Sequence, residues 1–448
     1  MTMSVTSAPR GKMVNGFDPA NASNLSPESR KLVERRIALL GPAYRLFYKD
    51  PVEVARANGV LLYDSEGNEY LDAYNNVVSI GHCHPRVVEA ITKQAQTICT
   101  HTRYIQKGIL DYAEQLLATF DGPARHAMFT CTGSEANDLA VRMAKHHTGN
   151  QGIIITDEAY HGNSELTAGF SPSLGPYSPL GTFVRRVPAP DSYRIAPENM
   201  GKWMAEKVSE QIVDLQRRGA GVACFIADSM FSSDGIFSHP TNLLQPVVDV
   251  IHKAGGIYIA DEVQSGFGRS GEKLWGYQRH GITPDIVTMG KPMGNGYPVA
   301  AAVMLPEIVE KFGRDNRYFN TFGGNTVAMA AAQAVLNVIQ DEKLLDNSLK
   351  VGKILREGFE ALAKKYQGIG DVRGSGLYVG VEMVKDRTSK EPDAAAAAAV
   401  VNGLRARRVL ISATGAAANT LKIRPPLVFT AAHADRLLTE ADAVFATL

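Results

Sequence analysis

The sequence is poor in cysteine, with four in 448 residues. These are Cys83, Cys99, Cys131 and Cys224, and they are scattered along the chain. So few and so widely spaced thiols exclude a disulfide framework and favour a reducing compartment. His82, Cys83 and His84 stand together, but adjacent residues do not easily converge on one ion, and no second ligand pair follows at zinc-site spacing. We therefore expect these residues to shape a loop and expect no metal site.

The chain also lacks an excess of charge of either sign and a long apolar run. Its 47 Lys and Arg residues nearly match its 46 Asp and Glu residues, for a formal net charge of +1. Nothing in this balance favours nucleic acid or an anionic membrane as a partner. The polar start "MTMSVTSAPRGKMVNG" does not resemble a secretory signal, and no apolar run is long enough for a bilayer. We expect a cytoplasmic protein with neither partner.

What the centre of the chain does contain is an alternation of short β-rich apolar runs with helical stretches. The expected strands are 127–132, 152–157, 223–228, 256–261, 285–290 and 299–305. This alternation is typical of an α/β protein with a mostly parallel sheet and helices on both faces. Ligands of such sheets gather at the carboxyl ends of the strands, where several of these runs end in Asp, Gly or Thr.

The two ends of the chain predict a second, smaller domain. Residues 59–76 have the pattern of a hairpin around the turn "DSEGN", and residues 325–366 have that of two helices. Further on, "GLYVGVEMV" and "TLKIRPPLVF" are typical of strands, with a helix expected around residues 393–409. We predict an N-terminal segment (1–75) that joins the small domain, a large domain (76–330) and a C-terminal small α+β domain (331–448).

The stretch "TGSEAND", residues 132–138, follows a predicted strand and opens a predicted helix. Free backbone N–H groups, hydroxyls and the positive end of a helix dipole suit a phosphate at such a turn. A plain Ser N-cap with Glu135 in the first turn fits the same residues. Taken alone, the stretch leaves both interpretations open.

Two other strand ends carry groups that are costly to bury without a partner. The run 256–261 ends in Asp261, and the run 285–290 is followed by Lys291 in "TMGKPMGNGYP". A buried carboxylate caps a helix, pairs with an arginine or holds a protonated pyridine nitrogen. A lysine in an apolar cleft has a lowered amine pKa and serves as nucleophile and base. A phosphate cradle, a strand-end carboxylate and a strand-end lysine are the groups that pyridoxal 5'-phosphate (PLP) requires.

Six motifs follow one another in order: "GHCHP", "GSEAND", "YHG", "ADEVQSGFGRSG", "PDIVTMGKPMGNG" and "FNTFGGN". With them the chain, from about residue 40 onward, resembles the class III (subgroup II) aminotransferases of PLP fold type I. The resemblance implies PLP as cofactor and a large domain with a mostly parallel seven-stranded sheet beside a small α+β domain. It also implies a homodimer at least, with a tetramer left open.

The resemblance assigns cofactor roles residue by residue. It implies that Lys291 is the Schiff-base lysine, that Asp261 partners the pyridine nitrogen and that Gln264 faces the ring hydroxyl. Tyr160 would stack on the ring, with His161 beside it as another cofactor-binding residue. Tyr160 and Gln264 also fit ordinary packing and capping roles.

The phosphate of the cofactor is assigned to two parts of the chain. The resemblance implies that Gly133 and Ser134 hold it from their own subunit. Thr321 of "FNTFGGN" would reach the phosphate of the neighbouring subunit's cofactor, which puts the active sites at the dimer interface.

At the substrate end the chain departs from ordinary members of this family. Aminotransferases that bind a substrate carboxylate contain a stretch like "IRFAPPL", and aligning the prolines puts Lys422 of "LKIRPPL" at the position of their arginine. The glutamate that partners this arginine is missing as well, since "FIADSMFSSDG" offers only Asp and Ser. Lysine still binds an anion, but without the planar fork that matches a carboxylate.

A second departure is the pair Asn75 and Asn76, which stands where amine transaminases tend to carry bulky apolar residues. Two adjacent amides supply donors for an oxygen-rich group. Asn is also a common choice in turns, so the two interpretations stay open.

Further stretches, among them "APDSYR", "FIADSM" and "RRVLISATGAAANTLKIRPPLVFT", resemble the ethanolamine-phosphate phospho-lyases and phospho-hydroxylysine lyases. Ethanolamine phosphate has no carboxylate, which agrees with the lost Arg/Glu pair. The resemblance implies that lysine takes a proton from the aminated carbon and that phosphate leaves the adjacent carbon, with acetaldehyde and ammonia as products. Candidates to bind this phosphate by charge or position are Lys422, Arg103, Asn75, Asn76 and His82.

Two other functions are weighed beside the phospho-lyase. A class III ω-aminotransferase would move an amino group between an amine or ω-amino acid and a keto acid. A PLP-binding regulatory or scaffold protein without catalysis is disfavoured, because Lys291, Asp261 and Tyr160 are all present.

Overall fold

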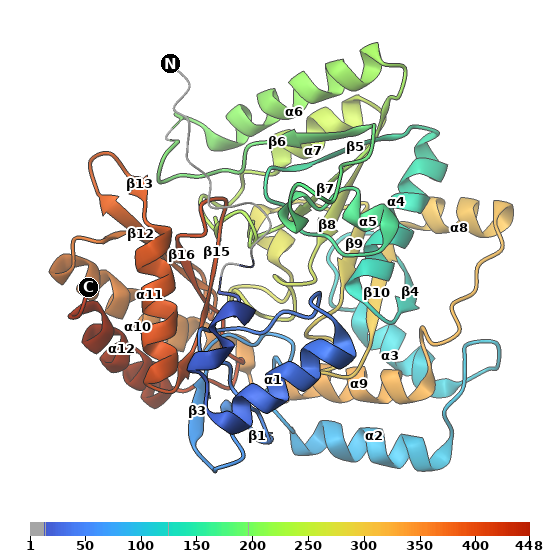
Figure 1. The fold of residues 1–448 in the computed structure, drawn as a ribbon. Coiled ribbons are helices and arrows are strands. Elements are labelled where there is room, and N and C mark those ends of the chain that lie inside the picture. Colours follow the sequence, from blue (N-terminus) through green and yellow to red (C-terminus); the bar gives the residue numbers. More distant parts are fainter. Residues whose placement is uncertain (1–12, 14, 124, 196) are drawn as a thin grey trace.

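A seven-stranded sheet forms the centre of the computed structural model, which describes residues 13, 15–123, 125–195 and 197–448 (Figure 1). Its strand order is β4-β10-β9-β8-β7-β5-β6. The strands are β4 (His126–Thr130), β5 (Gly152–Thr156), β6 (Val184–Val187), β7 (Val222–Asp228), β8 (Ile257–Asp261), β9 (Ile286–Met289) and β10 (Ala300–Met304). β10 runs antiparallel to β4 and β9, and the other neighbours are parallel. The expected mostly parallel sheet is confirmed.

The sequence pattern predicts six of these strands and misses β6. The residues of β6, "VRRV", include Arg185 and Arg186, which interrupt the apolar pattern. β6 lies at the edge of the sheet, where it pairs with β5. An edge strand buries less surface than a central one, so two arginines do not prevent pairing there.

Alternate residues of the central strands pack on opposite faces of the sheet. In β5, Ile153 and Ile155 share a core with α4 (Gly133–Thr148) and α8 (Pro306–Asp315). Ile154 shares a different core with α6 (Met200–Arg217) and α7 (Gln245–Lys253). Successive side chains of a strand point to opposite faces, so apolar runs of this kind need helices on both sides. The predicted α/β arrangement is confirmed.

The two ends of the chain meet in a second sheet. β1 (Arg56–Asn58), β2 (Leu61–Tyr63) and β3 (Glu69–Asp72) pair antiparallel, and β14 (Val409–Leu410) joins β3 in parallel. β2 and β3 are the hairpin predicted for residues 59–76. The parallel pairing shows that the N-terminal and C-terminal segments fold together. The domain boundaries at residues 75 and 330 stay predictions.

A third sheet is built from the last part of the chain, in the order β11-β12-β16-β15 with β13 paired to β12. Its strands are antiparallel: β11 (Ile369–Gly374), β12 (Val379–Asp386), β13 (Glu391–Pro392), β15 (Ser412–Thr414) and β16 (Thr420–Ile423). The helices α10 (Leu344–Lys365) and α11 (Ala394–Ala406) pack against this sheet, and α12 (Ala431–Phe445) packs against both helices (Figure 1). The predicted α+β composition of this part is observed.

The remaining helices surround these sheets. They are α1 (Pro27–Leu40), α2 (Pro85–Thr97), α3 (Lys107–Leu117), α5 (Glu165–Ala168), α9 (Thr326–Asp341) and the 3-10 helices η1 (Pro19–Asn24), η2 (Pro172–Leu174) and η3 (Gly276–His280). α9 and α10 are the two helices predicted for residues 325–366. None of the helices in the described part of the chain has the length and apolarity that a membrane span requires.

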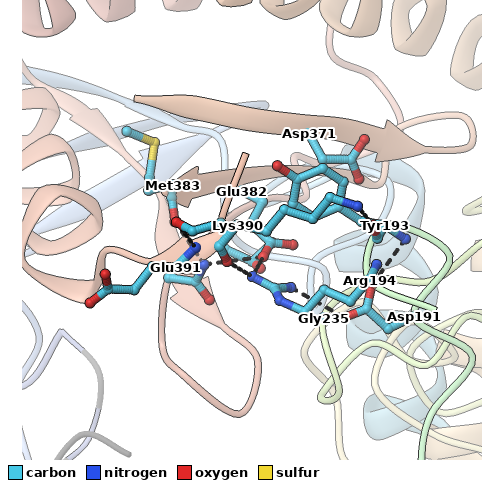
Figure 2. Close-up of polar contacts among 12 residues, drawn as sticks. Asp191, Tyr193, Arg194, Gly235, Asp371, Glu382, Met383, Lys390 and Glu391 are labelled. Atoms are coloured by element: carbon cyan, nitrogen blue, oxygen red, sulfur yellow. Dashed lines mark hydrogen bonds and ion pairs between the residues drawn. The ribbon is translucent and has the colours of Figure 1, made fainter. Parts of the chain in front are cut away.

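A buried ionic cluster holds the third sheet to the loop that follows β6 (Figure 2). Glu382 on β12 is 1% exposed, and its carboxylate accepts from Arg194 at 2.5 Å and from Arg373 at 2.6 Å. Arg194 also pairs with Asp191, and Arg373 with Asp371. We call these five residues the Glu382 cluster. Each of its cations has two carboxylate partners, so its charges are matched inside the protein.

Candidate active site

The carboxyl ends of neighbouring strands in the large sheet open onto a cavity of about 310 Å³. In the sheet register, Asp228 of β7 lies beside Asp261 of β8, which lies beside Thr288 of β9. The predicted cofactor residues on the cavity wall are Gly133, Ser134, Tyr160, His161, Asp261, Gln264 and Lys291. The structure thus brings together residues from four separate stretches of the chain.

The helix α4 begins at this cavity with an open first turn. Its N-cap is Thr132, whose Oγ1 accepts from the N–H of Glu135 at 3.2 Å, while Glu135 Oε2 accepts from the N–H of Thr132 at 3.3 Å. The alternative of a Ser N-cap is therefore wrong, and Ser134 lies inside the first turn. The first N–H groups of a helix have no acceptor within it. At Gly133 and Ser134 these groups and the helix dipole suit a phosphate.

Two glycines let the backbone of the lysine turn approach α4. A Cβ on Gly290 would lie 3.2 Å from the backbone N of Gly133. A Cβ on Gly133 would lie 2.9 Å from Cγ1 of Val263. A larger residue at either position would push these segments apart. Close backbone packing therefore places Lys291, the residue after Gly290, beside the start of α4.

Asp261 is held in position by three donors. Its Oδ2 accepts from His161 Nδ1 at 2.7 Å and from Asn137 Nδ2 at 2.9 Å, and its Oδ1 accepts from the N–H of Val263 at 3.0 Å. The Thr288 hydroxyl donates to Asn137 Oδ1 at 2.6 Å and so orients the amide. A carboxylate offers about four lone-pair sites, which leaves one for a proton donor in the cavity.

Lys291 follows β9 and is half-buried beside Tyr160. Its Nζ lies 5.9 Å from the centroid of the Tyr160 ring. Burial and the positive charge of Arg424 lower the pKa of Lys291 to about 8, against the smaller opposing effects of Asp261 and Asp228. An amine with this pKa is partly neutral near pH 8, and a neutral amine acts as nucleophile and base.

Another group of buried cations lies close to Lys291. The Oε1 atom of Gln264 accepts from Arg424 Nη1 and lies 3.4 Å from Lys422 Nζ and 3.5 Å from Tyr378 Oη. We call these four residues the Gln264 cluster. Within the described ranges of the chain, neither Lys422 nor Arg424 forms an ion pair with a carboxylate. Burial, with the charge of Arg424 second, lowers the pKa of Lys422 well below its usual value.

The predicted substrate residues of the N-terminal segment make local contacts. His82 Nε2 lies 2.7 Å from Asp72 Oδ2, and Asn75 Oδ1 accepts from the N–H of Val77 at 3.0 Å. Asn76 is 1% exposed, and within the described residues its side-chain amide has no hydrogen-bond partner. Val77, the next residue, lines the cavity. Of these three, Asn76 is the one whose amide is left for a ligand.

Arg103 and Thr321 do not lie on the cavity wall of this chain. Both are exposed, and the Arg103 guanidinium stacks on the Phe319 ring at 3.8 Å from its centroid. Their predicted roles, phosphate binding for Arg103 and contact with the neighbouring subunit's cofactor for Thr321, stay predictions.

Asn137, Tyr378 and Arg424 were not among the predicted site residues. Asn137 lies in "GSEAND", four residues after Gly133, and this helical spacing places both on one face of α4. Arg424 lies two residues after Lys422, directly beyond the end of β16, and the spacing of an extended chain predicts both on one side. Those spacings were available signals. Tyr378 has no such signal, because its contact with Gln264 spans 114 residues of sequence.

The groups on the cavity wall fit PLP. Lys291 supplies the amine, Asp261 the carboxylate for a pyridine nitrogen, and Gly133 with Ser134 the phosphate donors. His161 Nε2 is buried at this wall with no partner among the described residues, so the site has polar capacity that the protein does not use. The residues that would hold the cofactor are therefore Lys291, Asp261, Gly133, Ser134 and Tyr160.

Comparison with known proteins agrees with this site. The family described as aminotransferase class-III matches residues 47–445. "Alanine--glyoxylate aminotransferase 2-like" of Drosophila melanogaster is 41% identical over 414 residues, which is 89% of this chain and 83% of that protein. "Ethanolamine-phosphate phospho-lyase homolog 1" of Caenorhabditis elegans is 39% identical over 447 residues, 95% of this chain and 96% of that protein.

Among solved structures, a phospholyase from Arthrobacter in complex with phosphoethanolamine has a TM-score of 0.90 and 42% sequence identity. The match covers 93% of this chain and 100% of that one, so the two share the whole fold, including the seven-stranded sheet. This is PLP fold type I, and the family's cofactor is the one that the cavity fits. The chain belongs to the class III aminotransferases, a family of PLP-dependent enzymes.

Proposed function

We propose that this enzyme is a PLP-dependent phospho-lyase that converts ethanolamine phosphate, or a close amino-alcohol phosphate, to an aldehyde, ammonia and phosphate. The observation that carries the proposal is the pair Lys422 and Arg424. Both are buried beside Lys291, and neither has a carboxylate partner among the described residues. Buried cations are unfavourable without a counter-charge, so this pair suits an anionic substrate group.

The carboxylate whose charge acts on Lys422 is Asp228, but among the described residues the two form no ion pair. Asp228 at the end of β7 accepts from the N–H groups of Met230 at 2.9 Å and Ser232 at 3.2 Å, so its carboxylate caps its own turn. Burial raises the pKa of Asp228 and makes it a weaker counter-ion. A carboxylate-binding aminotransferase pairs its arginine with a glutamate here, whereas this chain leaves its cations for the substrate.

Relatives of both kinds are similar to this chain. The phospho-lyase homolog of Caenorhabditis elegans and the phosphoethanolamine-bound phospholyase of Arthrobacter support a phosphorylated amine as substrate. The aminotransferase-like protein of Drosophila melanogaster supports the alternative, an ω-aminotransferase. Identity near 40% does not separate them, so the choice depends on the cation pair.

Each group of the site has a part in the elimination. PLP, when bound, draws electrons away from the carbon that carries the substrate amine. Lys291 Nζ takes the proton from that carbon. The Asp261 carboxylate would face the pyridine nitrogen and favour its protonated, positively charged form. The C–O bond to phosphate then breaks and its electron pair leaves with the phosphate. The two-carbon amine that remains takes up one water and gives acetaldehyde and ammonia.

We also propose that the enzyme works as a homodimer. Large apolar side chains near Arg103 and Thr321 are exposed: Tyr104 by 64%, Ile105 by 96% and Phe322 by 69%. A cluster of this kind marks an interface more often than a free surface. A second copy on this surface would bring Arg103 and Thr321 close to the partner's cavity.

The test is to incubate the PLP-loaded protein with ethanolamine phosphate and no keto acid, and to measure free phosphate and acetaldehyde. Equal amounts of both products are expected. Lys291→Ala should lower the rate by more than about 10³-fold, because it removes the base and the attachment point together. The exposed Lys353→Ala on α10 is the matched control and should keep the rate.

A different set of products would contradict the proposal. If no phosphate appears, yet an amine with pyruvate yields alanine over many turnovers, the enzyme is the ω-aminotransferase. If Lys291→Ala keeps both activity and the visible absorbance of attached cofactor, the cofactor assignment itself fails.

A further inference from the structure

A chain of buried hydrogen bonds runs from β9 through α4 to the carboxylate of Asp261. The Thr288 hydroxyl donates to Asn137 Oδ1 at 2.6 Å. Asn137 Nδ2 donates to Asp261 Oδ2 at 2.9 Å and to the carbonyl oxygen of His161 at 2.7 Å. Thr288, Asn137 and Asp261 are each less than a tenth exposed, so bulk water does not replace a bond that is lost here. The three side chains therefore act as one unit.

The Asn137 amide fits this chain in one direction. Its Nδ2 faces two acceptors, the Asp261 carboxylate and the His161 carbonyl oxygen. A flipped amide would turn its own oxygen toward both of these oxygens. In the direction that the structure has, the Thr288 hydroxyl donates to the amide and Asp261 Oδ2 accepts from it. Because an amide does not titrate, Asn137 is a permanent donor to the carboxylate.

Donors of this kind make a carboxylate a weaker base. Hydrogen bonds to the ionised form stabilise that form and lower its affinity for a proton. His161 Nδ1 and the N–H of Val263 also reach Asp261, at 2.7 and 3.0 Å. The backbone N–H is held by the main chain, whereas the Asn137 amide depends on Thr288 for its direction. The strength of Asp261 as a base therefore depends on a hydroxyl that does not touch it.

Thr288 acts on the cavity through Asn137. It lies beside Asp261 in the register of β8 and β9, but it is not among the residues that line the cavity, whereas Asn137 and Asp261 are. Asn137 follows Gly133 by four residues, which is about 6 Å along α4. One helix would thus present its first turn to the phosphate of the cofactor and its next turn to the carboxylate that faces the pyridine nitrogen.

We propose that Asn137, oriented by Thr288, keeps Asp261 a weaker base than the pyridine nitrogen of bound PLP, so that the proton between them stays on the nitrogen. A positively charged ring draws electrons away from the reacting carbon more strongly than a neutral ring. Asn137 and Thr288 are thus positioning residues that act through Asp261. The inference concerns the cofactor and holds for a lyase and an aminotransferase alike, so it does not depend on the proposed substrate.

The experiment observes the proton on the ring nitrogen and does not require turnover. The protein is loaded with PLP that carries ¹⁵N in the ring, and the ¹⁵N NMR shift is measured at neutral pH. Wild type should have the shift of a protonated nitrogen. Asn137→Leu removes the donor at similar size, so the proton should pass to Asp261 and the shift should move toward that of an unprotonated nitrogen. PLP affinity of the cofactor-free protein should fall by about tenfold.

Two changes at Thr288 separate its hydroxyl from its packing. Thr288→Val keeps the shape but frees the Asn137 amide to turn, so the ¹⁵N shift should move in the same direction by a smaller amount. Thr288→Ser keeps the hydroxyl and should have the wild-type shift. The matched control is Thr156→Val. Thr156 ends β5, is also buried, and donates to Asp234 Oδ2 at 2.8 Å, so its loss should leave the shift unchanged.

Three outcomes would overturn the inference. The first is an unchanged nitrogen shift in Thr288→Val and Asn137→Leu; if Asn137→Leu does not fold, Thr288→Val alone decides. The second is a shift in Thr288→Ser as large as in Thr288→Val, because the cause would then be packing of the methyl group. The third is an equal shift in Thr156→Val, which would mean that loss of any buried hydroxyl disturbs the ring.

Discussion

Two buried charged clusters lie close together on the third sheet and differ in how their charges are matched. In the Glu382 cluster, Arg373 also donates to Thr420 Oγ1 of β16 at 3.2 Å. Lys422 of the Gln264 cluster is two residues further along β16 and so lies on the same face. Both clusters thus face the large domain, where their partners are found: Arg194 for the first (Figure 2) and Gln264 for the second.

The difference lies in the acceptors. Glu382 receives two arginines that each have a further carboxylate, and its pKa is lowered because their charges outweigh the effect of burial. Lys422 and Arg424 share a neutral amide. Burial of matched charges is compatible with a purely structural role, whereas burial of unmatched cations persists where function requires it. The first cluster fixes the third sheet in place, and the second is available to a ligand.

The strongest test of this contrast is Glu382→Gln. It leaves the buried Arg373 and the partly exposed Arg194 with one carboxylate each, so the free energy of unfolding should fall by about 2 kcal/mol. Urea unfolding measures the change. Phosphate affinity of the folded protein should stay within about threefold of wild type, because the cations that face the cavity are untouched.

Glu391→Gln is the matched control for this change. Glu391 on β13 pairs with Lys385 at 2.5 Å, but both side chains are more than half exposed. Exposed ion pairs contribute little to stability, so the free energy of unfolding should not change. If Glu382→Gln behaves in the same way as Glu391→Gln, the Glu382 cluster does not hold the third sheet in place.

Lys422→Met should not lower the free energy of unfolding, in contrast to Glu382→Gln. It removes a buried amine that forms no ion pair with a carboxylate among the described residues and keeps an apolar stem of similar length, so stability should stay equal or rise by about 1 kcal/mol. The same change should weaken binding of inorganic phosphate. A clear loss of stability, measured by urea unfolding of the cofactor-free protein, would show that Lys422 is a structural charge after all.

The smallest effect expected is on the pH dependence of stability. The pKa of Lys291 in the fold is about 8 and that of Lys422 is well below its usual value, whereas both are ordinary in the unfolded chain. Between the folded and unfolded pKa values the unfolded chain binds more protons, so stability rises with pH in that window. One such lysine adds at most about 1.4 kcal/mol per pH unit.

Unfolding of the cofactor-free protein at several pH values between 8 and 10 tests this slope. Wild type carries two such lysines and Lys422→Met carries one, so the variant should gain less stability across the window. A parallel rise in both proteins would mean that Lys422 keeps an ordinary pKa in the fold.

Much of the fold and of the cofactor site was predictable from local pattern. Apolar runs that alternate with helices predicted six strands of the large sheet, because a strand buried on both faces must be apolar throughout. Asp261 and Lys291 were predictable because each directly follows such a run, and the ends of parallel strands meet at one edge. Resemblance to a family then assigned Tyr160, Gly133 and Ser134 to one cofactor, and all of them line one cavity.

The edge strand β6 was not predicted, and the N-cap of α4 was not decided, because the sequence close to each is ambiguous. Arg185 and Arg186 hide an edge strand, which has less surface to bury. Thr132 and Ser134 are equally good capping residues in a sequence, and the choice depends on where the helix begins.

The contacts at the proposed substrate site could not be predicted from local sequence patterns, since they join residues far apart in the chain. Arg424 meets Gln264 across 160 residues, and Asn137 meets Asp261 across 124. The sequence alone establishes which residues are available and which strand or helix carries them, because periodicity and turn chemistry act over a few residues. Whether a buried cation finds a carboxylate or a neutral amide depends on how distant segments pack, and for Lys422 and Arg424 only the folded chain decided that.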